Sequence, residues 1–337
     1  MGKSPAELIL SGERMALARL LTQVENGSPE GRTTLDELFP YTGKAHLIGV
    51  TGAPGTGKSS LVNQITLQYR KPAADDPKRV AIVAVDPTSP FTGGAVLGDR
   101  VRMRDLAGDP GVFIRSMASR GSLGGLAQAT AAMVQVFDAA GFEVILIETV
   151  GAGQTEVDIA RLAHTTLVVE APGLGDEIQA IKAGILEIAD ILVVNKADLP
   201  GVENTERALK SMLGLAHPVG KVFRHHGQAM DLPSSELVNT SLWVPPILRT
   251  IATDGTGVGE LMAAIEQHAQ HLRQSGDWGR RERTRLEAEL EALLTDTLVA
   301  QFRLSVPDVC YEEVIDRMVE RTLSPGEAVK VLLNGEA

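Results

Sequence analysis

The stretch that most restricts how this chain can fold runs from Gly52 to Ser59 and reads GAPGTGKS. It follows an apolar run that ends at Val50, and a helical pattern begins at Ser60. An apolar strand, a glycine-rich loop and a helix form the setting in which G-x-x-x-x-G-K-[ST] makes a phosphate-binding loop. The sequence therefore predicts an α/β domain of the P-loop NTPase type that binds a nucleoside triphosphate.

Each part of this loop has an expected contact with the triphosphate. Backbone N–H groups of the loop turn inward as donors to phosphate oxygens, and the following helix adds the positive end of its dipole. Lys58 supplies a positive charge for the β- and γ-phosphates, and the hydroxyl of Ser59 is an expected ligand for Mg²⁺. The residues expected to contact the nucleotide here are Gly52, Ala53, Pro54, Gly55, Thr56, Gly57, Lys58, Ser59 and Ser60.

Strand and helix patterns alternate over residues 43–275, which predicts a Rossmann-like, mostly parallel sheet with helices on both faces. Several of the strand patterns are near-continuous Val, Ile and Leu runs, as expected for strands that are buried on both sides. Strands are expected at 46–50, 80–85, 112–114, 144–148, 166–170, 191–195 and 246–251. Helices are expected near 59–70, 95–107, 123–140, 155–163, 177–189, 203–213 and 257–272, and 214–245 is expected to be a loop.

Helical extensions are predicted at both ends of this domain. One helix is expected over residues 4–24, where Ser4 and Glu7 have capping-box spacing, and a short one over 32–39. After Gly276, leucines recur at spacings of three and four in a long helix, followed by helices near 308–321 and 324–333. These last helices are expected either to pack on their own domain or to form a dimer contact. The domain boundaries predicted are 1–42, 43–275 and 276–337.

A second motif, Asn195-Lys196-Ala197-Asp198, ends a later strand of the same sheet. In an N-K-x-D motif the Asp carboxylate accepts hydrogen bonds from guanine N1–H and the guanine 2-amino group, whereas adenine offers neither donor and is rejected. Asn195 is expected to brace the surrounding loops, and the Lys196 stem to lie along the base. Ala252 is expected to give its N–H to guanine O6. The pair of motifs favours GTP over ATP.

Metal and switch chemistry is expected from carboxylates near strand ends. Asp86, Asp99 and Glu148 are the candidates, because Mg²⁺ prefers oxygen ligands and usually keeps some of its waters. Glu148 is also a candidate catalytic residue. Gly151 is expected to donate its N–H to the γ-phosphate, and Gln154 is a candidate for positioning the attacking water, although it stands three residues beyond that glycine.

Composition excludes several classes of function. The net charge is −11 and aromatic residues make up 4% of the chain, so a nucleic-acid surface of basic and aromatic residues is not expected. The single cysteine, Cys310, cannot form a disulfide framework or a multi-cysteine metal site. No apolar run reaches the roughly 20 residues of a membrane span, and no signal-peptide pattern is present. A cytoplasmic protein with no membrane or nucleic-acid partner is expected.

The order of these motifs resembles one known family. The relevant stretches are 50–60, 86–89, 93–100, 148–156, 172–179 and 195–198. Together they closely resemble the MeaB/ArgK family, P-loop GTPases that are allied to the metallochaperone GTPases and that chaperone methylmalonyl-CoA mutase. The resemblance extends over most of the chain, including both helical extensions.

The resemblance implies a G domain that hydrolyses GTP slowly, uses Mg²⁺ and forms a homodimer through its C-terminal extension. It implies a role in delivering adenosylcobalamin to the mutase and in protecting or reactivating that enzyme. It assigns the metal and switch carboxylates to Asp86, Asp99 and Glu148. It also implies a third switch over 172–182, in which Asp176, Gln179 and Lys182 are coupled to the partner; Lys182 is the candidate for a catalytic charge brought in when the switch closes.

Two other functions stay open at this point. One is an NTP-dependent kinase or transport-type ATPase, which the N-K-x-D motif disfavours. The other is a metallochaperone GTPase for a different metalloenzyme, which the lack of a Cys/His cluster disfavours. The sequence also leaves open whether the partner is a methylmalonyl-CoA mutase or a mutase of a related acyl-CoA.

Overall fold

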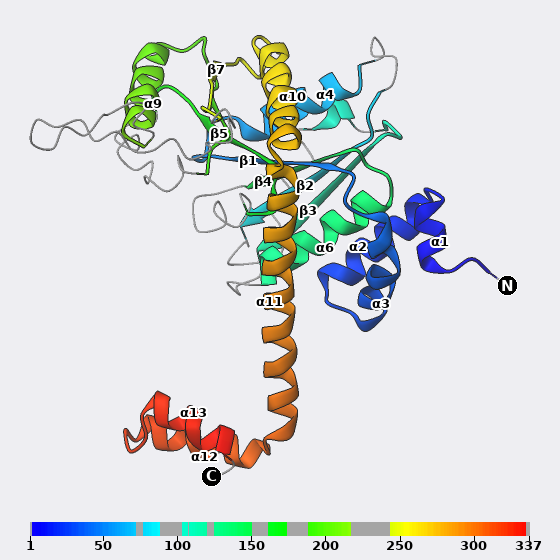
Figure 1. Ribbon diagram of the computed structural model, residues 1–337, viewed down its shortest axis with the longest axis vertical. Helices are drawn as coiled ribbons and strands as arrows, with labels where there is room; N and C mark the ends of the chain where they lie inside the picture. The colour runs from blue at the N-terminus through cyan, green and yellow to red at the C-terminus, as the bar shows by residue number, and fades with distance from the viewer. Residues whose placement is uncertain are drawn as a thin grey trace, which may run out of the picture. The chain divides into compact units, whose positions relative to one another are not determined.

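The structure of the chain is a computed structural model, which describes residues 2–71, 77–87, 103–106, 108–119, 125–149, 161–173, 188–216 and 243–334. The chain forms two compact units, Met1–Arg285 and Leu286–Ala337. The first unit contains a seven-stranded sheet of order β3-β2-β4-β1-β5-β6-β7, in which all the paired strands run parallel (Figure 1). The expected α/β fold with a parallel sheet is confirmed.

All seven predicted strands are present in the described part of the chain, and only their bounds differ. They are β1 His46–Thr51, β2 Val80–Pro87, β3 Val112–Ser119, β4 Val144–Thr149, β5 Thr165–Glu170, β6 Ile191–Val194 and β7 Ile247–Arg249. Every residue of β1, β4, β5 and β6 is buried. Their unbroken apolar runs therefore match strands that are covered on both faces.

The sheet has its switch point at β1, which pairs with β4 on one side and β5 on the other. The chain continues from β1 toward β2 on the first side and later places β5, β6 and β7 on the second. In open α/β sheets, ligands bind outside the carboxyl ends of the strands at such a point. The loop that begins at Gly52 directly follows β1, so the fold places it at this position.

Different helices cover the two faces of the sheet (Figure 1). The four helices α1 Pro5–Leu10, α2 Arg14–Glu25, α3 Pro29–Leu38 and α6 Gly125–Ala139 contribute to one core, and α4 Lys58–Tyr69 and α10 Val258–Ser275 to the other. Helix α9 Val202–Ala216 packs through Val202 and Leu209 against Val168, Leu192 and Val194. The expected helices near 59–70, 123–140, 203–213 and 257–272 are confirmed.

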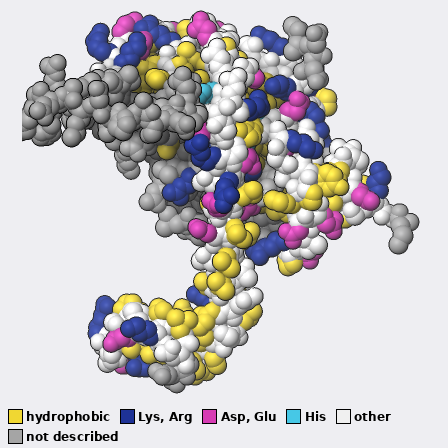
Figure 2. All heavy atoms as spheres, viewed as in Figure 1, with side chains coloured by type: hydrophobic (Ala, Val, Ile, Leu, Met, Phe, Trp, Pro, Cys, Tyr) yellow, Lys and Arg dark blue, Asp and Glu magenta, His cyan; other side chains and the backbone are white. Residues whose placement is uncertain are grey.

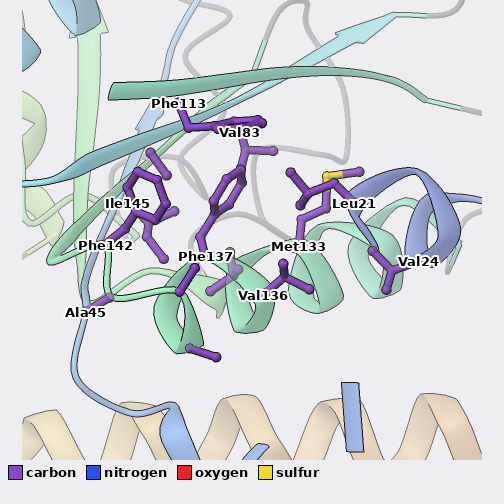
Figure 3. Close-up of a cluster of buried hydrophobic side chains, with 14 of the residues drawn as sticks. Leu21, Val24, Ala45, Val83, Phe113, Met133, Val136, Phe137, Phe142 and Ile145 are labelled. Atoms are coloured by element: carbon purple, nitrogen blue, oxygen red, sulfur yellow. The ribbon is translucent and has the colours of Figure 1, made fainter. Parts of the chain in front are cut away.

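Three phenylalanines fill the core under α6 (Figure 3). The ring of Phe137 from α6 has its centroid 5.4 Å from that of Phe113 on β3 and 5.4 Å from that of Phe142, which precedes β4. Val83 and Ile145 from the sheet and Leu21 from α2 complete the same cluster. Contacts of this kind between aromatic rings add to the stabilisation from burial. Because Leu21 belongs to the same cluster, the N-terminal helices share the main core of the first unit.

The N-terminal extension corrects one prediction. The single helix expected over 4–24 is wrong: α1 ends at Leu10 and α2 starts at Arg14, with Gly12 between them at φ +82°. Glycine adopts this left-handed backbone at little cost, and the Glu13 side chain caps the new helix. The capping box of Ser4 and Glu7 is confirmed. Helix α3 starts at Pro29 rather than residue 32, and a short η1 Phe39–Tyr41 follows it.

The C-terminal helices lie close to their predicted places. They are α11 Asp277–Ser305, α12 Asp308–Val319 and α13 Pro325–Asn334. In the second unit, Val314, Leu323 and Ala328 form a small core between α12 and α13. Most of the expected elements near 95–107, 155–163, 177–189 and 214–245 lie outside the described residues, apart from a short η2 Arg104–Leu106. Among the described helices, none combines the length and the hydrophobicity needed to cross a membrane.

Buried and half-buried charged groups join the start of α11 to the amino ends of β5 and β6. Arg281 donates from both terminal nitrogens to the two oxygens of Asp190, at 2.7 Å each, and His268 of α10 contacts the same carboxylate at 3.3 Å. Glu282 pairs with Nε2 of His164. The residues His164, Asp190, His268, Arg281 and Glu282 are called the amino-edge cluster below.

We expect the amino-edge cluster to make the fold sensitive to acid. Burial alone would raise the pKa of Asp190, but hydrogen bonds from His268 and Arg281 outweigh it and lower the pKa to about 2. Burial likewise opposes the lowered pKa of Glu282, which His164 and Arg285 bring to about 2. Carboxylates whose pKa is lower in the folded chain stabilise it fully above their unfolded pKa, and this contribution is lost as the pH falls through the folded pKa.

The expected result is a fall in the free energy of unfolding as the pH drops from about 5 to about 2, of which Asp190 alone accounts for about 2 kcal/mol. Urea unfolding at a series of pH values measures it. The variant Asp190→Asn should be less stable at neutral pH and should lose part of the acid dependence. An acid dependence of equal size in this variant and in the wild type would contradict the assignment.

Candidate nucleotide-binding site

The loop between β1 and α4 has the backbone of a phosphate cradle. Gly52, Gly55 and Gly57 have φ values of +137°, +82° and +92°, a region that residues with a Cβ rarely adopt. Thr56 is fully buried, and its hydroxyl donates to the carbonyl of Ala53 at 3.0 Å. The chain therefore turns tightly from the end of β1 into the amino end of α4, where N–H groups are available to an anion.

Close packing is a second reason why position 52 requires glycine. A Cβ at this position would lie 2.0 Å from the carbonyl oxygen of Val169 on β5, which is backbone and cannot move aside. We expect Gly52→Ala to lower the free energy of unfolding by at least about 3 kcal/mol, because it combines a clash with a strained backbone. Gly55→Ala is the matched control, since it shares the positive φ but has no atom within 4 Å of the added Cβ.

Urea unfolding of both variants measures this difference. Gly55→Ala should cost only about 1 kcal/mol, from the left-handed backbone alone. Equal losses in the two variants would show that the packing of the loop against β5 does not matter.

Lys58 and Ser59 stand at the first turn of α4. The Lys58 ammonium donates to the carbonyls of Gly52 and Ala53 at 2.7 and 2.9 Å, so it spans the loop from the helix side. The Ser59 hydroxyl donates to Oε1 of Glu148 at 2.6 Å. Both Ser59 and Glu148 are buried, at 5% and 1% exposure. Two hard oxygen donors side by side at the loop fit Mg²⁺.

Asn195 joins the phosphate loop to the loop that follows β7. Its amide nitrogen donates to the carbonyl of Thr56 at 2.8 Å. Its side-chain oxygen accepts from the Thr250 hydroxyl and from the Ala252 N–H, both at 3.1 Å. Asn195 is 1% exposed. Its bonds hold together two loops, of which one lies 139 residues before it in the chain and the other 55 to 57 residues after it. A Cβ on Gly57 would come within 2.4 Å of the same amide nitrogen.

The predicted base-recognition residues surround this brace. Lys196 has φ +56°, a left-handed backbone that costs a residue with a side chain about 1–2 kcal/mol, and such strain is typical of functional loops. Asp198 is exposed and open to a ligand. The Ala252 N–H already donates to Asn195, so a contact with guanine O6 would have to share or replace that bond. The roles of these residues toward guanine remain predictions.

Several expected site residues lie outside the described part of the chain. These are Asp99, Gly151, Gln154, Asp176, Gln179 and Lys182, together with the side chain of Asp86, whose backbone pairs with Ala118 in the sheet. Pro54 and Ser60 lie in the described loop and in α4. The structure thus brings Lys58, Ser59 and Glu148 together at the start of α4. It separately brings Asn195 and Ala252 together beside the phosphate loop.

Sequence reasoning missed residues outside the motifs that support this site. Thr250 is fully buried and holds the Asn195 side chain in its orientation. Thr149 donates its hydroxyl to that of Thr51 at 3.1 Å, which fixes the ends of β4 and β1 beside each other. Threonines near strand ends are common, so only the parallel pairing of β1 with β4 identifies them as neighbours.

Comparison with known proteins decides the family. The protein-family model described as "Methylmalonyl Co-A mutase-associated GTPase MeaB" matches residues 17–306. The chain belongs to the MeaB family. A putative GTPase of Pyrococcus abyssi is 42% identical over 327 residues, covering 97% of this chain and 94% of that protein. GTPase ArgK of Escherichia coli is 32% identical over 329 residues, covering 95% and 92%.

A solved structure agrees with the fold of this MeaB-family chain. The crystal structure named LAO/AO transport system kinase has a TM-score of 0.65 and 27% identity, covering 98% of this chain and 95% of that one. The resemblance found in the sequence motifs is confirmed by the family match. This MeaB-family protein is therefore a GTPase that binds GTP and GDP.

Proposed function

We propose that this MeaB-family GTPase assembles, protects or reactivates an adenosylcobalamin-dependent acyl-CoA mutase of the methylmalonyl-CoA mutase type. The family description, which associates MeaB with methylmalonyl-CoA mutase, supports the choice of partner. The observation that carries the proposed mechanism is the Asn195 brace, because one side chain ties the phosphate loop to the expected base loop. A nucleotide that contacts both loops would thus be sensed by both motifs at once.

In this proposal Lys58 and the loop amides hold the phosphates, Ser59 and Glu148 hold Mg²⁺, and Asp198 selects guanine. Mg²⁺ would neutralise charge that develops on the phosphate oxygens. Asp86 and Asp99 are the proposed additional carboxylates, with Gly151 at the γ-phosphate and Gln154 or Lys182 as candidates for completing the hydrolytic site. Hydrolysis would release the switch segments, and the mutase would respond to that change.

The proposed dimer would form through the C-terminal extension, 276–337. Figure 2 shows hydrophobic side chains along the later part of α11 and on α12 and α13. On α11, Leu290, Leu294 and Leu298 are 66%, 53% and 55% exposed, and their spacing of four places them along one side of the helix. Rows of exposed leucines on a soluble helix usually mark an interface, and a second copy of the chain is the proposed occupant.

We expect Leu294→Glu combined with Leu298→Glu to convert a dimer to a monomer, because two carboxylates would be buried without partners. Light scattering after size exclusion measures the mass. Ala288→Glu is the control, since it adds a carboxylate to the same helix away from the leucine row and should leave the mass unchanged. Wild-type protein that is already monomeric at micromolar concentration would contradict the proposal.

The proposed function is tested by adding purified candidate mutases to the chain with GTP, GDP or a non-hydrolysable GTP analogue. We expect a complex whose affinity differs between the GTP and GDP states, and recovery of activity by a mutase that holds a damaged cofactor only when GTP is hydrolysed. Lys58→Ala serves as the control that should fail to reactivate. Equal binding in all nucleotide states, or no binding to either methylmalonyl-CoA or related mutases, would overturn it. Transfer of labelled γ-phosphate to a protein or small molecule would support a kinase instead.

A further inference from the structure

A cavity of about 440 Å³ lies at the other end of the strands from the phosphate loop. It is bounded by the turn that joins α1 to α2, by the segments that lead into β2 and β4, and by the start of β3. Its lining includes Gly12, Arg14, Leu17, Arg79, Asp109, Phe113 and Phe142. A volume of this size falls within the lower part of the range for sites that bind small molecules, roughly 300–1,000 Å³.

Two arginines of this cavity stack on a shared aromatic floor. The guanidinium carbon of Arg14 lies 4.9 Å from the centroid of the Phe113 ring, and that of Arg79 lies 4.5 Å from the centroid of Phe142. The two rings meet edge to face, with centroids 6.4 Å apart, and both are at least nine-tenths buried. Stacking orients each guanidinium plane before any ligand arrives, which reduces the entropy lost on binding.

Only part of the donor capacity of these arginines is used within the protein. Arg14 donates to the carbonyls of Val112 and Pro110 at 3.0 and 3.5 Å, and Arg79 donates to the carbonyl of Ala140 at 2.8 Å. A guanidinium carries five N–H donors, so most of them have no acceptor among the described residues.

Two carboxylates, Asp109 and Glu143, act electrostatically on these arginines, but among the described residues neither pairs with their guanidinium groups. Over the part of the chain that the structure describes, neither Arg14 nor Arg79 forms an ion pair within 4.0 Å. The carboxylate that lines the cavity, Asp109, is held at 2.7 and 2.9 Å by Arg70. Burial lowers the pKa of Arg79; Glu143 opposes this, while Arg14 and Arg70 act in the same direction as burial. Arg14, Arg70 and Arg79 thus outnumber Asp109 and Glu143 here, which leaves one positive charge in excess among these five groups, in a chain whose net charge is −11.

We propose that this cavity binds a small dianion whose acidic oxygens accept hydrogen bonds from Arg14 and Arg79 together. Paired guanidiniums in a fixed orientation recognise phosphate and carboxylate groups through two-pronged hydrogen bonds. The ligand class is thus a phosphate monoester or a short dicarboxylate, and the phenylalanine floor suits a small apolar portion of either. Because Arg14 begins α2 and Arg79 leads into β2, the bound dianion would join the N-terminal extension to the sheet.

Titration calorimetry on the full chain tests the proposal. A non-hydrolysable GTP analogue and Mg²⁺ are present at saturation, so that the phosphate loop and the γ-phosphate position are not available to the probes, which are inorganic phosphate, glycerol phosphate and glutarate. We expect at least one of them to bind at micromolar to millimolar concentration. In the variant Arg14→Gln/Arg79→Gln we expect the affinity to fall by at least about tenfold. Arg19→Gln, an exposed arginine of α2 outside the cavity lining, should bind as the wild type does.

The three probes separate the two sources of such a ligand. Binding of glycerol phosphate alone or of glutarate alone supports the proposal and assigns the class, whereas no binding by any of the three overturns it. Unchanged affinity in the double variant also overturns it. The single variant Arg14→Gln alters an exposed side chain and keeps the test valid if the double variant does not fold.

Hydrogen exchange gives a readout that does not depend on GTP turnover or on a mutase. With the bound probe we expect slower exchange over residues 11–20 in the wild type and no change in the double variant. Slowing of equal size in both proteins would overturn the proposal. The proposed chaperone function can fail while this site binds its dianion, and the reverse, so the two outcomes are distinguishable.

Discussion

Asp198→Asn should exchange the base preference of this GTPase from guanine to xanthine. In the proposed site the Asp198 carboxylate accepts from guanine N1–H and the 2-amino group. An amide at the same place accepts from N1–H but presents its own N–H₂ to position 2, where xanthine has a carbonyl and guanine has a donor. A site with mismatched polar groups rejects the wrong ligand by about 10⁴-fold, so the ratio of kcat/KM for GTP to that for XTP should fall by about this factor.

The measurement is phosphate release with GTP and with XTP, each over a range of concentrations. Asp36→Asn, a surface change on α3 in the N-terminal extension, is the control and should leave the ratio as it is. If Asp198→Asn keeps the wild-type preference for GTP, Asp198 does not contact the base, and the assignment of 195–198 is wrong.

Lys58→Ala should nearly abolish hydrolysis. The Lys58 ammonium lies over the phosphate loop, held by the carbonyls of Gly52 and Ala53, and it is only 6% exposed. Its charge would stabilise the oxygens of the transferred phosphoryl group in a site shielded from water, where a single donor is worth about 10²–10³-fold in rate. We expect turnover to fall by at least this factor at saturating GTP.

The control for Lys58→Ala is a second variant, Lys44→Ala. Lys44 is an exposed lysine just before β1, so its loss removes the same charge from the protein without touching the loop, and turnover should be unchanged. Circular dichroism and thermal unfolding of both variants check that the fold is intact. Turnover of Lys58→Ala within about tenfold of the wild type would contradict the role given to this residue.

The parts of the structure that could be predicted are those whose signal lies in residues that are adjacent in the sequence. The phosphate loop and the N-K-x-D motif are contiguous, and strands buried on both faces have distinctive apolar runs. Helix α11 was likewise visible from its leucine spacing. The break between α1 and α2 at Gly12 was not, because Leu10 and Leu17 keep helical spacing across it and one glycine alone does not decide against a helix.

Features that assemble distant residues could not be predicted. The amino-edge cluster draws His164, Asp190, His268 and Arg281 from four separate segments, and none of them belongs to a recognisable pattern. The same holds for Thr250 beside Asn195, since a buried threonine has no signature until the parallel pairing of β6 with β7 is known. The cavity lined by Arg14 and Arg79 depends on a turn between α1 and α2 that the sequence analysis did not predict.

The amino-edge cluster has a practical consequence for anyone who shortens this protein. A chain cut at Gly276 would lose Arg281 and Glu282, so the buried Asp190 carboxylate would keep His268 but lose its paired guanidinium, and the His164 ring would lose the carboxylate at Nε2. A chain that ends after Arg285 keeps both contacts. The safe place to detach the C-terminal helices is therefore two turns inside α11, not at the loop before it.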